Sequence, residues 1–183
     1  MSRILVLLPL LAGCSFAPQY LNRDIHLVAV IPTFNDTTDL DAPKVVWPLV
    51  EDAVGGRGYR SVPRSTIQDF YAKNRFGIAD EIRMYRWDQL AKEWNCDALL
   101  YSKVEEYGRP LLLDAVVKVR LELVDGRTGE TVWTGEGRAN AGEEDDSLLG
   151  GITASLPHLA HRACARAAAG LPLPGFDPRG AKK

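Results

Sequence analysis

Three deficits in this sequence limit what the protein can be. The 183 residues include only three histidines and three cysteines, so few side chains are available to ligate a metal or to pair a nucleophile with a base. The formal net charge is −2, and a chain without an excess of basic residues is a poor candidate for nucleic-acid binding. No internal apolar run approaches the ~20 residues that a transmembrane helix needs. We therefore expect no nucleic-acid partner.

The motifs of the common enzyme classes are missing too. The GGRG stretch at residues 55–58 lacks the Lys-Ser/Thr ending of a phosphate-binding loop, and there is no G-x-S-x-G nucleophile elbow. His26 is the only histidine outside the C-terminal helical region, so a Ser-His-Asp or Cys-His site is hard to assemble. We predict a protein that is not an enzyme and that has no cofactor.

A zinc site near the C-terminus is the main alternative. His158, His161 and Cys164 follow an H-x2-H-x2-C spacing, which places them within about a 120° sector of a helix. With Cys96 as a fourth ligand, this set would suit zinc. However, H-x2-H on a helix is not a standard ligand pair, and Pro157 disturbs the turn. We predict no metal site and two ordinary histidines on an alanine-rich helix.

Two clusters of acidic residues are candidates for a binding site. Residues 143–146 (EEDD) lack the D-x-D-x-D-G arrangement of a calcium loop, so we predict a solvated loop before the final helical region. The second group is Asp36, Asp39 and Asp41, which with Asn35 make up a candidate partner-contact loop. Such side chains commonly cap turns, but they would also suit a loop that contacts a partner, because rigid scaffolds tend to display function on loops.

The first fifteen residues have the layout of a secretory signal. Arg3 precedes a short apolar run at residues 4–11, and small residues then lead to Cys14. The run is too short for a membrane span and contains a proline. An ordinary cleaved signal and a structural segment are the alternatives. Because the L-A-G-C ending resembles the lipobox of bacterial lipoproteins, we predict a signal peptide at residues 1–13 and a diacylglyceryl group on Cys14.

This N-terminus predicts where the protein resides. In known lipoprotein sorting, a residue other than Asp after the cysteine favours the outer membrane, and here that residue is Ser15. Residues 14–24 form the predicted tether, which reaches about 33 Å when extended. The predicted location is the periplasmic face of the outer membrane, with the lipid bilayer as one partner. In that oxidising compartment Cys96 and Cys164 either form a disulfide or remain two separate buried thiols.

Periodicity predicts one α/β domain at residues 25–171, followed by a disordered tail at 172–183. Residues 113–124 alternate between apolar and charged side chains, which indicates a strand with one face on the core. We expect strands at residues 25–31, 59–62, 98–107, 113–124 and 131–139, a polar loop at 33–41, and helices from 43, 65 and 85. The last helical region includes Leu149, Ile152 and Ala163, with Pro157 as a kink.

Local residue choices sharpen this outline. Ser65 is the expected N-cap of the second helix. Gly135 and Gly137 share a strand face with Trp133, so another backbone can approach closely there. Trp47 beside Pro48 is either a core residue or an interface aromatic. The predicted order β-α-β-α-α-β-β-β-α indicates helices packed on a mixed sheet of about five strands.

Four stretches resemble one family. Their sequences are IPTFNDTTD at 31–39, CDALLY at 96–101, EEYG at 105–108 and DGRTGETVWTG at 125–135. In this order they resemble the GNA-type family of bacterial outer-membrane lipoproteins, small surface-antigen proteins of unknown function. The chain departs from the family pattern at Thr33, where a second proline is usual, and at Cys96, where a small residue is usual.

The resemblance implies a periplasmic α/β domain tethered to the outer membrane, a homodimer, and no enzymatic activity. The implied shape is similar to the N-terminal domain of the Tol-Pal beta-propeller protein and to the lipoprotein activators of penicillin-binding proteins. Our leading hypothesis is an interaction or assembly module that contacts other cell-envelope proteins. The alternatives are a regulator of a peptidoglycan synthase and, less favoured, a metal-binding or hydrolytic enzyme.

Overall fold

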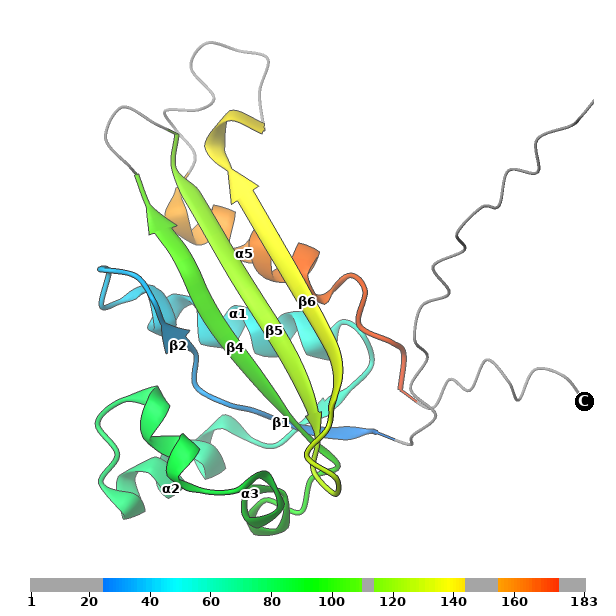
Figure 1. Ribbon diagram of the computed structural model, residues 1–183. Coiled ribbons are helices and arrows are strands. Elements are labelled where there is room, and N and C mark those ends of the chain that lie inside the picture. Colours follow the sequence, from blue (N-terminus) through cyan, green and yellow to red (C-terminus); the bar gives the residue numbers. More distant parts are fainter. Residues whose placement is uncertain (1–24, 110–113, 144–154, 175–183) are drawn as a thin grey trace, which may run out of the picture.

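The computed structural model describes residues 25–109, 114–143 and 155–174, which form a mixed six-stranded sheet with helices on both faces (Figure 1). The elements in chain order are β1 Leu27–Val30, β2 Phe34–Asn35, α1 Ala42–Gly55, β3 Arg60–Ser61, α2 Arg64–Asn74, the 3-10 helix η1 Ala79–Met84, α3 Trp87–Glu93, β4 Ala98–Gly108, β5 Val116–Asp125, β6 Thr131–Asn140, the 3-10 helix η2 Ala141–Glu143, and α5 Leu156–Ala168. Within the described ranges no helix is long and apolar enough to cross a membrane.

The strand order across the sheet is β3-β1-β4-β5-β6, and β2 pairs with β4 further along that strand. Strand β1 pairs in parallel with β3 and with β4, and β2 also pairs in parallel with β4. Strand β5 pairs antiparallel with both β4 and β6. Long hairpin strands and short parallel strands therefore share one sheet, and the predicted mixed α/β architecture is confirmed.

One face of the sheet is covered by α1 and α5, which lie behind the strands in Figure 1. Helix α1 buries Val46, Val50 and Val54 at four-residue spacing, so one continuous stripe points at the sheet. Strand β5 adds alternate buried residues such as Val119 and Leu121. The alternation predicted for this strand is confirmed.

Helix α5 packs unusually close to the edge strand β6. A Cβ atom on Gly137 would overlap the carbonyl oxygen of Ala163, and one on Gly135 would overlap that of Ala167. The predicted close approach of a backbone at these two glycines is thus confirmed. Cys164 lies in the same interface and is 1% exposed.

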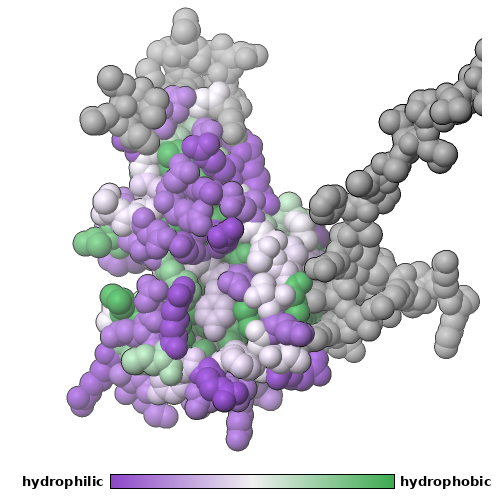
Figure 2. All heavy atoms as spheres, viewed as in Figure 1, coloured by the Kyte–Doolittle hydropathy of each residue, from purple (hydrophilic) through white to green (hydrophobic). Residues whose placement is uncertain are grey.

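The opposite face is only partly covered. Helices α2 and α3 with η1 pack over one end of the sheet, where Phe70 makes edge-to-face contacts with Phe76, Tyr85 and Trp94. Beyond them the strands β4, β5 and β6 carry charged side chains, and Figure 2 shows hydrophilic residues gathered over this region. Lys118 on β5 lies 2.9 Å from a carboxylate oxygen of Glu105.

Two short elements were not expected. The sheet has six strands rather than about five because Phe34–Asn35 pairs with β4 inside the segment predicted as a loop. Likewise Ala79–Met84 forms a 3-10 helix ahead of α3. A two-residue strand and a six-residue 3-10 helix are too short for a periodic pattern to reveal.

Two helix starts differ from the predictions. Helix α2 begins at Arg64, directly after Pro63, so Ser65 lies inside the first turn and is not the N-cap. In α5, Pro157 occupies the first turn and does not kink the helix, since a proline fits where no backbone donor is needed. The hydroxyl oxygen of Ser155 accepts a hydrogen bond from the His158 N–H there. Leu149 and Ile152 lie outside the described residues.

The domain extends slightly beyond its predicted end. The guanidinium of Arg57 donates to the carbonyl oxygen of Leu171, and the Tyr59 hydroxyl donates to that of Pro172 at 2.7 Å. Residues 172–174 therefore pack beside the α1–β3 connection and do not belong to a disordered tail. Residues 175–183 lie outside the described part of the chain.

Candidate functional site

The segment between β2 and α1 is held in shape by its own side chains. Asn35 donates from Nδ2 to the carbonyl oxygen of Asp39 at 3.0 Å, and its Oδ1 accepts from the Thr37 N–H at 3.0 Å. The Asp39 carboxylate then accepts from the N–H groups of Asp41 and Ala42, at 2.8 and 3.2 Å. Asn35 and Asp39 thus stabilise the loop and cap the start of α1, in line with the turn-capping interpretation.

The other two residues of the predicted contact loop face outward. Asp36 pairs with Lys103 on β4, and Asp41 pairs with Lys44 on α1 at 2.7 Å. Both pairs are exposed, and exposed pairs stabilise a fold only weakly. These carboxylates are therefore available to exchange partners at the surface of a rigid loop.

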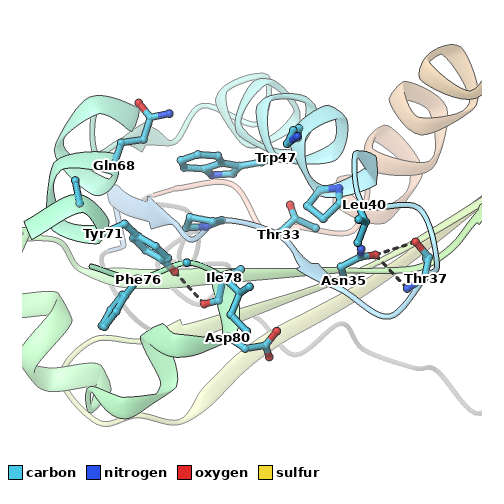
Figure 3. Close-up of a pocket in the computed structure, with 16 residues that line it drawn as sticks. Thr33, Asn35, Thr37, Leu40, Trp47, Gln68, Tyr71, Phe76, Ile78 and Asp80 are labelled. Carbon is cyan, nitrogen blue, oxygen red and sulfur yellow. Dashed lines mark hydrogen bonds between the residues drawn. The ribbon is translucent and has the colours of Figure 1, made fainter. Parts of the chain in front are cut away.

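A pocket of about 730 Å³, which we call the loop pocket, opens between this loop, α1, and the α2–η1 segment (Figure 3). Trp47, Tyr71 and Phe76 give it aromatic walls. The polar atoms of Trp47 and Tyr71 are already hydrogen-bonded within the domain. The Trp47 indole donates to the Val30 carbonyl at 3.0 Å, and the Tyr71 hydroxyl donates to the Ala79 carbonyl at 3.0 Å. Burial raises the pKa of the Tyr71 phenol, so this wall stays uncharged.

Two large apolar side chains line the loop pocket while remaining exposed. Leu40 is 83% exposed and Ile78 is 64% exposed. Leu40 comes from the capped loop, and Ile78 immediately precedes η1. Neither stands in a periodic pattern, so the sequence offered no signal for them beyond the neighbouring polar loop residues. Trp47, for which the sequence allowed either a core or an interface position, is half-buried and lines this pocket.

Two aspartates in the stretches that carry the family resemblance, Asp97 and Asp125, build the fold instead of a site. Asp97 accepts hydrogen bonds from the N–H groups of His26 and Leu27, both at 2.9 Å, and so fixes the start of β1. Asp125 is fully buried, and its Oδ1 accepts from the N–H groups of Arg127 and Thr128 at 2.7 and 3.1 Å. These carboxylates are occupied by backbone donors.

The two cysteines are not joined. Cys96 packs against the core under α2 and α3, whereas Cys164 lies in the core under α5, so the sheet stands between them. The structure thus corrects the possible disulfide and agrees with separate thiols. Burial raises the pKa of Cys96 to about 11 and that of Cys164 to about 12, which keeps both protonated at neutral pH.

The sequence spacing around His158 does not produce a ligand set. His158 and His161 are exposed on α5, whereas Cys164 points into the core and Cys96 lies on the other side of the sheet. Within the described ranges, no three His, Cys, Asp or Glu side chains are placed to hold a metal ion. Residues 144–146 of the acidic run lie outside those ranges.

Together these features define a class of protein: a small α/β domain that presents a preformed apolar pocket beside a rigid polar loop. The chain belongs to the GNA1162-like family, described as "Putative lipoprotein GNA1162-like", whose model matches residues 20–165. A relative in Neisseria meningitidis serogroup B, "Putative lipoprotein NMB1124/NMB1162", is 27% identical over 134 residues. That match covers 70% of this chain and 62% of the relative, so the chain spans less than two thirds of the relative's length.

Two solved structures share the fold. Lipoprotein GNA1162 from Neisseria meningitidis is 24% identical with a TM-score of 0.58, over 69% of this chain and 89% of that one. The PelC dodecamer from Paraburkholderia phytofirmans is 19% identical with a TM-score of 0.56, over 84% of this chain and 91% of that one. The family match indicates no catalytic family. The resemblance to the Tol-Pal beta-propeller domain stays a prediction.

Proposed function

We propose that this chain is a lipid-anchored, non-enzymatic assembly protein at the periplasmic face of the bacterial outer membrane. Cys14 would carry the lipid, residues 15–24 would form the tether, and the loop pocket would receive an apolar side chain of a partner. The observation that carries the proposal is the pair Leu40 and Ile78, which remain exposed where they line an apolar pocket. Leu40 stands on a loop that is held by internal hydrogen bonds, and Ile78 directly precedes η1.

The energetics favour contact at this surface. Burying a leucine or isoleucine side chain is worth about 1.5–3 kcal/mol, so covering Leu40 and Ile78 would supply a useful part of a binding free energy. The Asn35–Asp39 network fixes the loop before contact, which lowers the conformational entropy lost on binding. A short lipid tether would also raise the effective concentration of the domain near other membrane-bound proteins.

Association between copies of the chain is the first form of assembly to test. PelC, which shares the fold, is a dodecamer in its solved structures. A self-complementary contact would place Leu40 of each copy in the loop pocket of another and would bury Ile78 at the same time. The homodimer implied by the family resemblance would be the smallest such assembly.

The anchor is tested by metabolic labelling of the full chain with palmitate, followed by membrane fractionation. The proposal predicts labelled protein in the outer-membrane fraction, and unlabelled protein released from it for Cys14→Ala. An unchanged distribution of Cys14→Ala would contradict the anchor.

The contact surface is tested by the native size of the lipidated chain extracted in a mild detergent. Leu40→Asp combined with Ile78→Asp should reduce the assembly to single chains. Leu173→Asp is the matched control, since Leu173 is 53% exposed and lies outside the loop pocket. Equal native sizes for the unchanged chain, the double variant and Leu173→Asp would contradict assembly through this pocket.

A second outcome concerns the regulator alternative. Co-purification of a peptidoglycan synthase with the chain, retained in the Leu40→Asp and Ile78→Asp double variant, would favour that alternative.

A further inference from the structure

A second pocket lies on the other side of η1 and opens on the partly covered face of the sheet. It measures about 580 Å³, within the ~300–1,000 Å³ typical of small-molecule sites. We call it the arginine pocket, because Arg83, Arg86, Arg120 and Lys103 line it, while Glu122 is the one acidic residue among the described residues of its lining. In Figure 2 a hollow separates the hydrophilic surface over the upper strands from the surface over the lower helices.

Aromatic rings hold two of these arginines. The guanidinium carbon of Arg83 lies 4.5 Å from the ring centroid of Phe34, and Phe34 stacks on Tyr101 at 5.9 Å with an interplanar angle of 17°. On the other wall, the guanidinium of Arg86 lies 5.1 Å from the Trp87 ring centroid. Stacking uses the face of a guanidinium and leaves its N–H edges free to donate in the plane.

The cationic groups have partners, but these partners lie outside the pocket lining. Arg83 is 3.5 Å from Asp80, and Arg120 is 3.8 Å from Glu105. Arg86 pairs with Asp88 at 3.1 Å through its Nε, and Lys103 pairs with Asp36. Each pair has at least one exposed side chain, and such pairs contribute little to stability, so they exchange for a ligand that offers several oxygens at once.

Glu122 does not fill the arginine pocket. Its carboxylate accepts a hydrogen bond from the Thr131 hydroxyl on β6. The phenol of Tyr101 has its pKa raised to about 12, chiefly by burial, so at neutral pH it is an uncharged donor beside the cations. The pocket is therefore lined by N–H and O–H donors from η1, β4 and β5, together with flat apolar surfaces.

We propose that the arginine pocket binds a phosphate group carried on an apolar body. A phosphate presents more acceptor oxygens than a carboxylate, which suits several converging cationic donors, and arginine matches phosphate with paired N–H groups. Tyr85, Trp87 and Tyr101 offer aromatic surface to the attached body. The same chemistry occurs in a phospholipid headgroup and in a soluble phosphate ester, and the pocket accommodates either.

The test is calorimetric titration of the full lipidated chain, in a zwitterionic detergent, with phenyl phosphate. We expect saturable binding at one site per chain, and an affinity at least about tenfold weaker for Arg83→Gln combined with Arg120→Gln. Arg60→Gln is the matched control, because Arg60 is exposed on β3 and lies outside the arginine pocket. Arg60→Gln should bind phenyl phosphate with the affinity of the unchanged protein. The unchanged protein, the double variant and Arg60→Gln should all unfold at the same denaturant concentration.

Further ligands distinguish a lipid headgroup from a soluble phosphate ester, and they define the results that would overturn the proposal. Tighter binding of dihexanoyl phosphatidate than of phenyl phosphate assigns the pocket to a lipid headgroup, and the reverse order assigns it to a soluble ester. Stronger binding of benzoate than of phenyl phosphate would overturn the phosphate assignment. Equal affinity in the double variant, or no saturable binding to the folded chain, would overturn the pocket itself.

Discussion

The two faces of the sheet use alternate residues of the same strands for opposite purposes. On the face under α1 and α5, β5 contributes Val119 and Leu121 to a continuous core, and β6 contributes glycines that let α5 approach. On the other face β5 carries Lys118 and Arg120, which pair with the half-buried Glu105. The first face is thus covered by one continuous core, whereas the second face has a core only under α2 and α3, and its remainder and the two pockets are available for contacts.

The largest expected difference concerns thiol reactivity. At pH 8 the buried Cys164, with its pKa near 12, should react about a thousandfold more slowly with a disulfide reagent than a free cysteine of ordinary pKa. Cys96 is less buried and should react before Cys164. Thiol counting in denaturant should then reveal both groups. Recovery of neither thiol in the unfolded, unreduced chain would show that they are paired.

The next effect is a loss of stability at the tightest contact of the covered face. Gly137→Val should lower the free energy of unfolding by about 3 kcal/mol or more, because its side chain would push the α5 backbone away from β6. Denaturant unfolding measures the change. Gly55→Ala is the control, since no atom lies within 4 Å of a Cβ there. Equal effects of the two substitutions would refute the close packing of α5 on β6.

A smaller loss is expected in the β5–β6 hairpin. Asp125→Ala should destabilise the fold by about 2 kcal/mol, because it leaves the part-buried N–H groups of Arg127 and Thr128 without this acceptor. Asp69→Ala, an exposed change on α2, is the comparison. Unfolding curves that coincide for these two variants would rule out the capping role of Asp125.

The smallest effect should come from the open face. Lys118→Met removes ion pairs to Glu105 and Glu136, at 2.9 and 3.1 Å, which raise the pKa of the lysine. We expect a smaller change in the unfolding midpoint than at Asp125, and one that shrinks in high salt because these pairs are partly open to solvent. A large, salt-independent loss would mean that this face also holds the fold together.

The sequence was informative where a pattern repeats. The alternation along β5 and the small residues Gly135 and Gly137 led directly to the covered face and to the helix packed on it. Phe34–Asn35 and Ala79–Met84 escaped prediction because each depends on tertiary pairing that no local period encodes. These short elements border both pockets, so the predicted fold lacked the residues that shape its openings.

The family stretches proved to be mostly structural. Asp97 and Asp125 bind backbone N–H groups, and Asn35 with Asp39 caps α1. Such residues identify a fold because they stabilise its turns and its strand and helix starts, and for that reason they say little about a partner. Leu40, which lines the loop pocket and which we propose as a contact residue, lies between two aspartates and matches no pattern.

The central claim is that the loop pocket is the contact surface of a membrane-anchored assembly. The most direct measurement replaces Leu40 with a photo-crosslinking amino acid in the full chain and irradiates intact cells, with the same replacement at Leu173 as the control. We expect discrete crosslinked products, to a second copy or to another envelope protein, from position 40 alone. Equal products from both positions, or none from position 40, would contradict it.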